Sequence, residues 1–342
     1  MYVINAQNVN DALSQGTKLL MDKGQVVPSR GGPTLEMDAP VATVYHNPLE
    51  MVLMNSARDA NPFFHLMESL WILAAREDVK FLTEFNARMV DYSDDGVVFN
   101  APYGYRLRTG VSYTHDQLEE IIAILKIDPM SRQAVGQIWD DCDLQKPTKD
   151  KACNMSTVFR VRNNKLCLTV YNRSNDMIWG AYGANVVQFS MILQYVAAKL
   201  NMAVGTYTQV SNSYHVYTEG PGGEVWDKMK NIYQGQISDL FGDDCNPYSH
   251  INETVLMNPN QMPSFEHDLK QFFSTYDLFG IDEVANLSYW ESDYFKELVM
   301  PMLAVHRVHK NNGAEKALEY TNHIQADDWL IAATDWLTKR IK

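Results

Sequence analysis

Apolar residues recur at helical spacing in four stretches of the chain. The clearest is NPFFHLMESLWILAA, residues 61–75, where Asn61 suits the cap of a helix and Pro62 suits its first turn. The same period runs through three further segments, QLEEIIAILKI, ANVVQFSMILQYVAAKL and ADDWLIAATDWLTKRIK, at residues 117–127, 184–200 and 326–342. We expect each of the four stretches to form an amphipathic or buried helix.

Patterns typical of β-strands gather in the middle of the chain. Residue types favoured in strands fill four short segments, AVGQIW, STVFRVR, KLCLTVY and GTYTQV, at 134–139, 156–162, 165–171 and 205–210. Asn163 and Asn164 separate the second segment from the third and predict a hairpin turn. Helices before and after a central group of strands indicate an α+β fold rather than repeated βαβ units.

The length of 342 residues is compatible with one large domain. We expect a single domain over residues 1–342, in which about 241–342 forms a helical C-terminal extension. The turn-rich stretch 241–263 is expected to be a surface excursion, and its composition also fits a domain boundary.

The composition disfavours several classes of protein. No apolar run approaches the roughly 18 residues that a membrane helix needs, and no basic segment followed by an apolar block marks the N-terminus. We therefore expect a cytoplasmic protein without a membrane partner. The net charge of −13 disfavours a nucleic-acid partner. Any bound anion would need a local cluster of arginines.

Four cysteines are present: Cys142, Cys153, Cys167 and Cys245. They form no CxxC pair and no Cys/His ligand spacing, so we expect no metal site. Two disulfides are formally possible, but a reducing compartment argues against them. Cys167 alternates with leucines in a predicted strand and is expected to be a buried hydrophobe. Cys153 has polar neighbours on its loop side, where nearby cations would stabilise its thiolate as a nucleophile.

Two polar clusters have both a chemical and a structural interpretation. Arg173 with Ser174 suits a phosphate clamp, and equally a solvated turn. Asp176 suits a contact to the N–H of a heterocycle, and equally a cap on that turn. His215 and Tyr217 are able to hold a sugar, and equally to be polar groups of the core.

Glu68 shares a predicted helix face with Phe64, Trp71 and Ile72. Burial of a carboxylate there would raise its pKa and suit it to proton transfer. Its spacing also fits the edge of the apolar stripe, where it would be solvated.

Seven short motifs follow one another in order between about residues 30 and 217. They are ESLWIL, APYGYR, DPMSRQ, ACNMS, YNRSND, GANVVQF and SYHVY. With this series the chain resembles the thymidylate synthase and pyrimidine-nucleotide hydroxymethylase family. The resemblance implies a thymidylate synthase-like fold, with a central mixed β-sheet flanked by helices. It also implies a pyrimidine nucleoside monophosphate as substrate and 5,10-methylenetetrahydrofolate as co-substrate.

Four residues would carry the reaction if the resemblance holds. Cys153 would add to C6 of the pyrimidine and make C5 a carbon nucleophile toward the one-carbon unit of the folate. Glu68 would organise water and proton transfer, and Tyr103 would assist removal of the C5 proton. Asn185 would read the base, because an amide both donates and accepts, as uracil O4 and N3–H require.

The family implies further residues for binding the nucleotide and the folate. Those expected at the phosphate are Arg30, Arg132, Arg173 and Ser174. Of these, Arg132 would reach across a homodimer interface from the neighbouring subunit. Those expected at the sugar hydroxyl are His215 and Tyr217, and those expected at the folate are Asp176 and Trp71.

Departures from thymidylate synthases bear on the reaction. Ala152-Cys153-Asn154 stands where synthases carry Pro-Cys-His, and Arg132 is the one arginine left of the usual pair. Residues 86–95 (NARMVDYSDD) contain no tryptophan where synthases have a tryptophan-rich folate wall. The chain also ends in a charged amphipathic helix instead of a short apolar tail. Because methyl formation requires folate to stay packed with water excluded, these changes favour water attack and a hydroxymethyl product.

dUMP is the expected substrate, because cytosine-specific relatives place an aspartate where this chain has Asn185. The loop before Asn185 is one residue longer than in synthases, so a CMP or dCMP hydroxymethylase is an alternative. A divergent thymidylate synthase making dTMP and an inactive nucleotide-binding relative are the others. Enzymes of the favoured kind resemble those with which viruses modify their DNA, or those of nucleoside-antibiotic pathways.

Overall fold

In the computed structural model, which describes residues 1–109, 115–145, 147–233, 246–251 and 258–341, eight strands form one sheet. They are β1 (Tyr2–Ala6), β2 (Gln25–Val27), β3 (Thr34–Glu36), β4 (Val41–Tyr45), β5 (Val135–Gln137), β6 (Asn154–Arg162), β7 (Lys165–Asp176) and β8 (Ala203–Tyr217). The order is β1-β4-β8-β7-β6-β5, with β3 paired to β8 and β2 paired to β3. β1/β4 and β7/β8 are parallel and the other pairs antiparallel, which confirms the mixed sheet.

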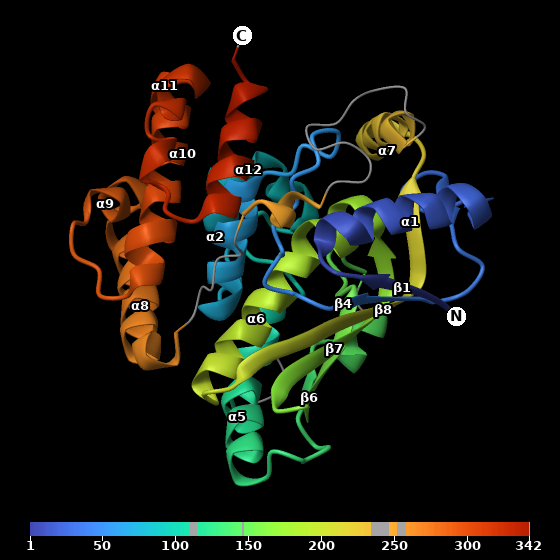
Figure 1. Cartoon of the computed structure of the whole chain (residues 1–342), viewed down its shortest axis with the longest axis horizontal. Coiled ribbons are helices and arrows are strands. Elements are labelled where there is room, and N and C mark those ends of the chain that lie inside the picture. Colours follow the sequence, from blue (N-terminus) through green and yellow to red (C-terminus); the bar gives the residue numbers. More distant parts are fainter. Residues whose placement is uncertain (110–114, 146, 234–245, 252–257, 342) are drawn as a thin grey trace.

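Helices flank this sheet and continue beyond it (Figure 1). Up to the end of the sheet region they are α1 (Val9–Lys23), α2 (Pro62–Leu73), α3 (Val79–Phe85), α4 (Tyr103–Arg108), α5 (Gln117–Ile127), α6 (Asn185–Lys199) and α7 (Gly220–Tyr233). The C-terminal part holds α8 (Met262–Phe279), α9 (Ile281–Asn286), α10 (Met300–Asn312), α11 (Ala314–Leu318) and α12 (Asp327–Thr338). The α+β fold with C-terminal helices is therefore confirmed. Cys245 lies outside the described residues, as do residues 241–245 and 252–257 of the turn-rich stretch 241–263.

The four helices expected from the sequence are present as α2, α5, α6 and α12. Asn61 caps α2 by accepting a hydrogen bond from the N–H of Phe64 at 3.1 Å, and Pro62 is the first residue of the helix. Asn163 and Asn164 have φ of 51° and 60° and form the tight turn between β6 and β7. Helix α1 and strands β1 to β4 add to the elements expected from the sequence.

The register of β6 and β7 brings Cys153 beside Arg173. Asn154, the first residue of β6, is paired with Asn172 of β7. The residues next to this pair therefore lie at the same end of the sheet. The backbone N–H of Arg173 donates to the carbonyl oxygen of Cys153 at 3.0 Å, which fixes their separation.

The register of β7 and β8 adds a second group of residues at that end. The two strands run parallel, with Ser174 opposite Ser213 and Asp176 opposite His215. Both strands extend past the segments predicted from the sequence, to Asp176 and Tyr217. Long-range pairing thus places the candidate residues of three strands together.

Helices α2 and α6 are buried on all sides. All twelve residues of α2 and fourteen of the fifteen residues of α6 are buried. Both helices therefore lie in the interior of the protein, together with the polar side chains that they carry. α4 approaches α2 so closely that a Cβ at Gly104 would lie 2.0 Å from the carbonyl oxygen of Ile72. Glycine at this position lets Tyr103, at the start of α4, lie against α2.

The C-terminal helices α8 and α10 lie on the side of α2 away from the sheet, and α12 overlaps one end of α2 in this view (Figure 1). Trp336 of α12 packs edge-on against Phe63 of α2, with ring centroids 5.5 Å apart. Arg340, just after α12, donates to both carboxylate oxygens of Asp59 at 3.1 and 2.9 Å. The C-terminal part therefore supports α2 and the loop that precedes it.

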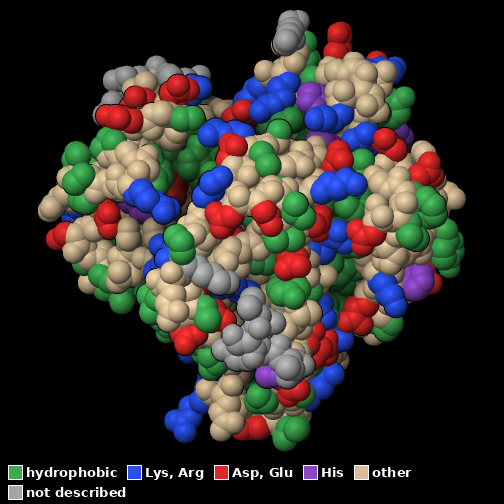
Figure 2. Space-filling view, turned by 180° about the vertical axis from the view of Figure 1, so that it is seen from behind, with side chains coloured by type: hydrophobic (Ala, Val, Ile, Leu, Met, Phe, Trp, Pro, Cys, Tyr) green, Lys and Arg blue, Asp and Glu red, His purple; other side chains and the backbone are tan. Residues whose placement is uncertain are grey.

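Charges of both signs are mixed on the face of the molecule shown in Figure 2. The negative net charge does not gather into one acidic patch on that face. Within the described ranges, no helix is both long and apolar enough to cross a membrane.

Candidate active site

Cys153 lies directly before β6, and its side chain is half-buried. Nη2 of Arg173 lies 3.8 Å from its sulfur. Burial raises the pKa of the Cys153 thiol, and the Arg173 cation opposes this shift without cancelling it. The charges of Asp150 and Asp176 raise that pKa further. The cation expected from the sequence is present, but burial outweighs it, so the ligand-free site favours the thiol.

Arg173 also fixes the backbone that carries the thiol. Its Nε and Nη2 donate to the carbonyl oxygens of the two residues before Cys153, at 2.8 and 2.9 Å. Its guanidinium lies over the ring of Trp139, 5.7 Å from the centroid. The side-chain hydrogen bonds of Arg173 to described residues use Nε and Nη2. Its Nη1 is therefore the guanidinium nitrogen that remains for an anion such as a phosphate.

Tyr103 of α4 lies at the backbone of Cys153, and Glu68 of α2 lies near Tyr103. Burial raises the pKa of Tyr103 well above its ordinary value, while a hydrogen bond with the backbone of Cys153 lowers it. The charges of Cys153, Asp150 and Glu68 all act on that hydroxyl group. We name Cys153, Arg173, Tyr103, Glu68 and Asp150 the Cys153 cluster.

Glu68 is buried, as its place among apolar residues suggests, and not at a solvated edge. It is 7% exposed and hydrogen-bonded to the side chain of Gln188 in α6. Its Oε2 has no hydrogen-bond partner within the part of the chain that the structure describes. Burial raises the pKa of Glu68 from 4.5 to about 7, and the Gln188 hydrogen bond opposes only part of that rise.

The raised pKa of Glu68 predicts a pH-dependent cost in stability. Between pH 4.5 and 7 the folded protein keeps a proton on Glu68 that the unfolded chain has lost, so the free energy of unfolding falls as pH rises. Between pH 5.5 and 8 this loss amounts to about 2 kcal/mol. The glutamine of Glu68→Gln cannot ionise, so this variant does not undergo the loss. The free energy of unfolding of Glu68→Gln minus that of wild type should therefore increase by about 2 kcal/mol between pH 5.5 and 8.

Urea unfolding of both proteins at the two pH values, which lie above the sequence pI of about 5.1, measures this difference. A difference between wild type and Glu68→Gln that is equal at both pH values contradicts a raised pKa.

Arg30 lies on an exposed loop that packs against Tyr217. A Cβ at Gly31 would lie 2.9 Å from the Tyr217 ring, and the Tyr217 hydroxyl is hydrogen-bonded to Ser29. The charges of Cys153 and Asp176 act on the same hydroxyl. The structure therefore brings the loop of Arg30 toward the Cys153 cluster, although Arg30 itself is exposed.

His215 and Tyr217, expected at the sugar, lie side by side near Asp176. Their rings meet edge-on, with centroids 5.6 Å apart. Nδ1 of His215 is 3.1 Å from the hydroxyl of Ser213, which faces Ser174 across the strands. The hydroxyl groups and the imidazole thus lie along one strand end.

The two carboxylate oxygens of Asp176 differ in their hydrogen bonding to the described residues. Oδ1 accepts from the backbone N–H groups of Ile178 and Trp179, at 2.8 and 2.7 Å. Oδ2 is buried and has no hydrogen-bond partner among the described residues. Burial raises the pKa of Asp176, while those N–H groups and the nearby side chains of His215 and Arg58 lower it.

Arg58 is a residue of this site that the sequence interpretation missed. It is 5% exposed, its Nε donates to the carbonyl oxygen of Ile178 at 2.8 Å, and its guanidinium lies 4.4 Å from the centroid of the Trp179 ring. Burial lowers the pKa of Arg58 to about 10. The signal in the sequence is an arginine in the loop NSARDANP, directly before a helix rich in apolar residues.

Residues 86–95 run beside the Cys153 cluster as a short helical turn (Ala87–Tyr92) without a buried residue. Val90 and Tyr92 are 44% and 55% exposed. Tyr92 lies near enough to Tyr217 to affect its pKa, and Asp94 accepts a hydrogen bond from the backbone N–H of Lys149 at 3.0 Å. The stretch expected to replace an aromatic wall is therefore close to the site, polar and open to water.

Trp71 contacts residues on both sides of this stretch, Asp78 before it and Phe99 after it. It is 4% exposed, its Nε1 donates to the carbonyl oxygen of Asp78 at 3.1 Å, and its ring packs edge-on against Phe99 at 5.7 Å. These contacts hold the ends of the 78–99 segment together. A direct contact of Trp71 with folate stays a prediction.

Asn185, the expected base reader, begins α6 and is buried. Its Oδ1 accepts from Nδ2 of Asn154 at 3.5 Å, and its Nδ2 donates to Oδ1 of Asn175 at 3.1 Å. Asn154 directly follows Cys153 in the chain, so the side chain of Asn185 contacts the residue next to the nucleophile.

Arg132 lies far from the Cys153 cluster of its own chain. It is exposed, and the carbonyl oxygen of Ser131 accepts from Arg160 of β6 at 2.9 Å. Arg132 is therefore level with the far end of β6, seven or eight residues from Cys153. At about 3.3 Å per residue this is roughly 25 Å, too far for an arginine side chain to cross.

A buried ion pair fixes α4, which carries Tyr103. Nη1 and Nη2 of Arg106 donate to the two carboxylate oxygens of Asp143, at 2.6 and 2.9 Å, and both side chains are at most 5% exposed. Arg106 also donates to the carbonyl oxygens of Ile138 and Asn100. Burial raises the pKa of Asp143, but the bond to Arg106 outweighs it and leaves that pKa lowered.

Asp143→Asn should lower the free energy of unfolding by about 3–5 kcal/mol, because it leaves the Arg106 charge buried without a counter-ion. The matched control is Glu319→Gln, which breaks the exposed pair of Lys316 and Glu319 and should cost at most about 1 kcal/mol. Urea unfolding at neutral pH compares the two. Equal effects would show that the Arg106 pair does not stabilise the fold as its burial implies.

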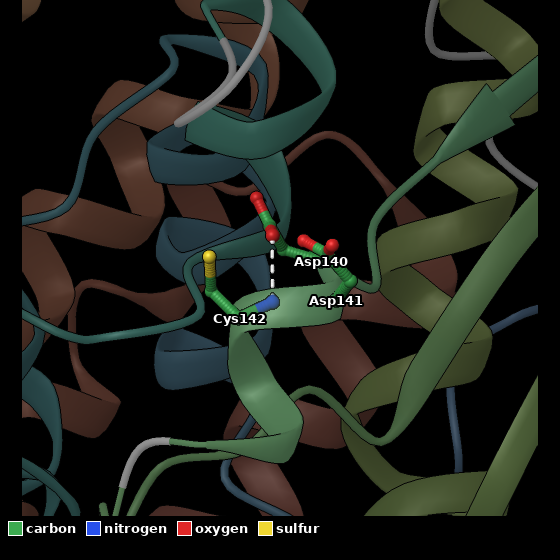
Figure 3. Close-up of side chains that lie close together, drawn as sticks. All are labelled: Asp140, Asp141 and Cys142. Atoms are coloured by element: carbon green, nitrogen blue, oxygen red, sulfur yellow. Dashed lines mark hydrogen bonds between the residues drawn. The ribbon is translucent and has the colours of Figure 1, made fainter.

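Asp140, Asp141 and Cys142 bring three possible metal-ligating atoms within 4.8 Å of one another (Figure 3). Asp140 caps the short helical turn there by accepting from the N–H of Cys142 at 3.0 Å. Asp141 and Cys142 are exposed. Helix capping is sufficient to account for the arrangement.

Known proteins resemble this chain over most of its length. The family model described as Thymidylate synthase matches residues 44–297. A protein of Pseudomonas phage M6 named deoxyuridylate hydroxymethyltransferase is 37% identical, covering 99% of this chain and 95% of its own. One of the same name from Bacillus phage SP01 is 39% identical, covering 78% and 73%. A putative thymidylate synthase of Methanosarcina mazei is 29% identical, covering 68% and 95%.

Proposed function

Because the chain belongs to the thymidylate synthase family, we propose that it is a folate-dependent hydroxymethyltransferase acting on C5 of dUMP. The products are 5-hydroxymethyl-dUMP and tetrahydrofolate. The observation that carries this proposal is the 37% identity, over 99% of the chain, to a protein named for that activity. The synthase-named relative from Methanosarcina mazei is less similar and covers less of the chain.

Cys153 starts the reaction by adding its sulfur to C6 of the pyrimidine. Because its pKa is raised, the thiol must pass its proton to water as the bond forms, and the Arg173 cation 3.8 Å away stabilises the developing thiolate. Arg173 with Ser174, and the loop of Arg30, bind the phosphate, while His215 and Tyr217 bind the sugar. Asn185 holds the base so that C6 faces the sulfur.

The residues present fit a folate co-substrate. Asp176 Oδ2 and Glu68 Oε2 are buried acceptors without partners among the described residues, and a pterin ring carries N–H groups that suit such an acceptor. Asp176 would hold the pterin. When bound, methylenetetrahydrofolate supplies the one-carbon unit to C5.

Tyr103 and Glu68 handle the protons that follow. The Tyr103 hydroxyl, held at the backbone of Cys153, assists removal of the proton from C5. Glu68, with a pKa of about 7, is able to take and return a proton near neutral pH and to orient water through Oε2. The bond between the one-carbon unit and the folate would break as tetrahydrofolate leaves, so that a methylene group remains on C5. Water then adds to this methylene carbon, and the bond between Cys153 and C6 breaks, which restores the C5–C6 double bond.

The surroundings favour water over hydride transfer. The 86–95 stretch presents exposed Val90 and Tyr92 in place of a flat indole surface, together with the exposed carboxylates of Asp94 and Asp95. α12 packs on α2 and on the loop before it. These features support a hydrated site in which tetrahydrofolate leaves before it is oxidised.

The distance between Arg132 and Cys153 supports a shared site in a homodimer. One subunit cannot bring Arg132 to its own phosphate position, whereas a neighbour related by twofold symmetry is able to supply it. We propose a homodimer with two such shared sites and no metal.

Mass spectrometry of the nucleotide product tests the proposed function. The enzyme is incubated with dUMP, dCMP or CMP and methylenetetrahydrofolate. Conversion of dUMP with a gain of CH2O is the expected result. A gain of CH2 identifies a thymidylate synthase, conversion of a cytosine nucleotide alone identifies the other hydroxymethylase, and no product identifies an inactive relative.

A further inference from the structure

A chain of buried amides leads from a backbone carbonyl to the base reader. Nε2 of Gln209, in β8, donates to the carbonyl oxygen of Ala181 at 3.0 Å and to the hydroxyl of Tyr45 at 2.5 Å. Gln209 is fully buried. Because a carbonyl oxygen only accepts hydrogen bonds, the Gln209 amide has its nitrogen at Ala181 and its oxygen on the other side.

The next amide follows from the first. Gln209 Oε1 accepts from Nδ2 of Asn175 at 3.1 Å, and the hydroxyl of Ser211 accepts from the same nitrogen at 3.0 Å. Asn175 is 2% exposed, and its nitrogen is held on that side, so its Oδ1 points the other way. A Cβ at Gly180 would lie 2.7 Å from this Oδ1, so glycine leaves the room it needs.

Asn185 receives its orientation from Asn175. Its Nδ2 donates to Asn175 Oδ1 at 3.1 Å, and its Oδ1 is therefore turned to Asn154, whose Nδ2 lies 3.5 Å away. An amide nitrogen has two hydrogens and an amide oxygen two lone pairs. Asn185 thus keeps one donor and one acceptor for a ligand, at fixed ends.

We propose that Asn175 and Gln209 set the orientation of the Asn185 amide and thereby select uracil over cytosine. Uracil offers an acceptor at O4 and a donor at N3, and cytosine offers the reverse. A freely rotating amide matches either base by turning through a half circle, whereas a fixed amide matches one. Turning Asn185 over would set its oxygen against Asn175 Oδ1 in a buried site, which costs both hydrogen bonds.

This inference rests on the proposed function, because it assumes that Asn185 contacts the base. Asn175 and Gln209 act through Asn185, and neither is assigned a contact with substrate. Their role is to position a specificity-determining side chain.

Binding of dUMP and of dCMP without folate, measured by calorimetry, tests the inference apart from the chemical step. We call the hydrogen-bond chain from Gln209 through Asn175 to Asn185 the relay. Asn175→Leu removes it. Gln209→Met keeps the side-chain volume and removes from the relay only the hydrogen bond that orients Asn175, which is a milder change. In both variants the preference for dUMP should fall by at least about tenfold. Ser211→Ala is the control, because it leaves the link to Gln209 in place, and it should change the preference by less than about twofold.

The outcomes separate the two proposals. A wild-type protein that binds both nucleotides equally overturns the assignment of Asn185 as base reader, and with it the proposed substrate. A wild-type preference for dUMP that persists in Asn175→Leu and Gln209→Met overturns the relay alone. A structural defect without a role in orientation would weaken both nucleotides equally and leave their ratio unchanged, which also counts against the relay.

Discussion

Cys153→Ser is expected to lower turnover of dUMP by at least about 10⁴-fold, without unfolding the protein. An alcohol is far less nucleophilic than a thiol at neutral pH, and no step of the reaction begins without a bond to C6. The Arg173 cation, 3.8 Å from the sulfur, is not a base able to activate a hydroxyl. Hydroxyl and thiol are similar in size, so the backbone contacts of Arg173 should persist.

Two other cysteines provide matched controls. Cys142 is exposed, and Cys142→Ser should leave both turnover and stability unchanged. Cys167 is buried in β7, and Cys167→Ser should lower the free energy of unfolding by about 1–2 kcal/mol while sparing turnover, because a hydroxyl is buried in place of a thiol. Initial rates of product formation and urea unfolding measure both effects. Turnover of Cys153→Ser within roughly a hundredfold of wild type contradicts a covalent role.

Mixing two inactive proteins, Cys153→Ser and Arg132→Ala, is expected to restore activity. In the heterodimer one of the two sites contains both substitutions. The other site contains a native Cys153 from one subunit and the native Arg132 of the neighbour. Random reassortment should return about one quarter of wild-type activity, since half of the dimers are mixed and each has one intact site. Refolding or dilution of the mixture allows the subunits to exchange before the assay.

The control for this experiment is a mixture of Cys153→Ser with Glu68→Gln. Both residues belong to the site of one chain, so each site of that heterodimer carries a lesion and activity should stay at the level of the single variants. Sedimentation at assay concentration completes the test. A fully active monomer, or no recovery in the first mixture, contradicts a shared phosphate site.

Much of the interior could be predicted because its signals are local. Asn61 and Pro62 predict the start of α2. Asn163 and Asn164 predict a turn that needs positive φ. The position of Glu68 on a helix face with Phe64, Trp71 and Ile72 indicates burial as one of two alternatives, and the structure shows that Glu68 is buried. These inferences depend on residues within a few positions of one another.

What the sequence could not predict depends on distant pairing or on the balance of opposing effects. Gln209 appears in a strand pattern, but its partner is the backbone carbonyl of Ala181, and only the fold brings the two together. Arg58 gains its role from Ile178 and Trp179, which lie more than a hundred residues away in the chain. For Cys153, a cation and burial shift the pKa in opposite directions, and the residue types alone do not show that burial prevails.

The fate of the one-carbon unit tests the account most directly. The reaction is run with dUMP and methylenetetrahydrofolate in water labelled with oxygen-18, while absorbance reports dihydrofolate. We predict 5-hydroxymethyl-dUMP with the label in its new hydroxyl group and no rise in dihydrofolate. Formation of dihydrofolate in step with an unlabelled 5-methyl product would contradict the account and identify the protein as a thymidylate synthase.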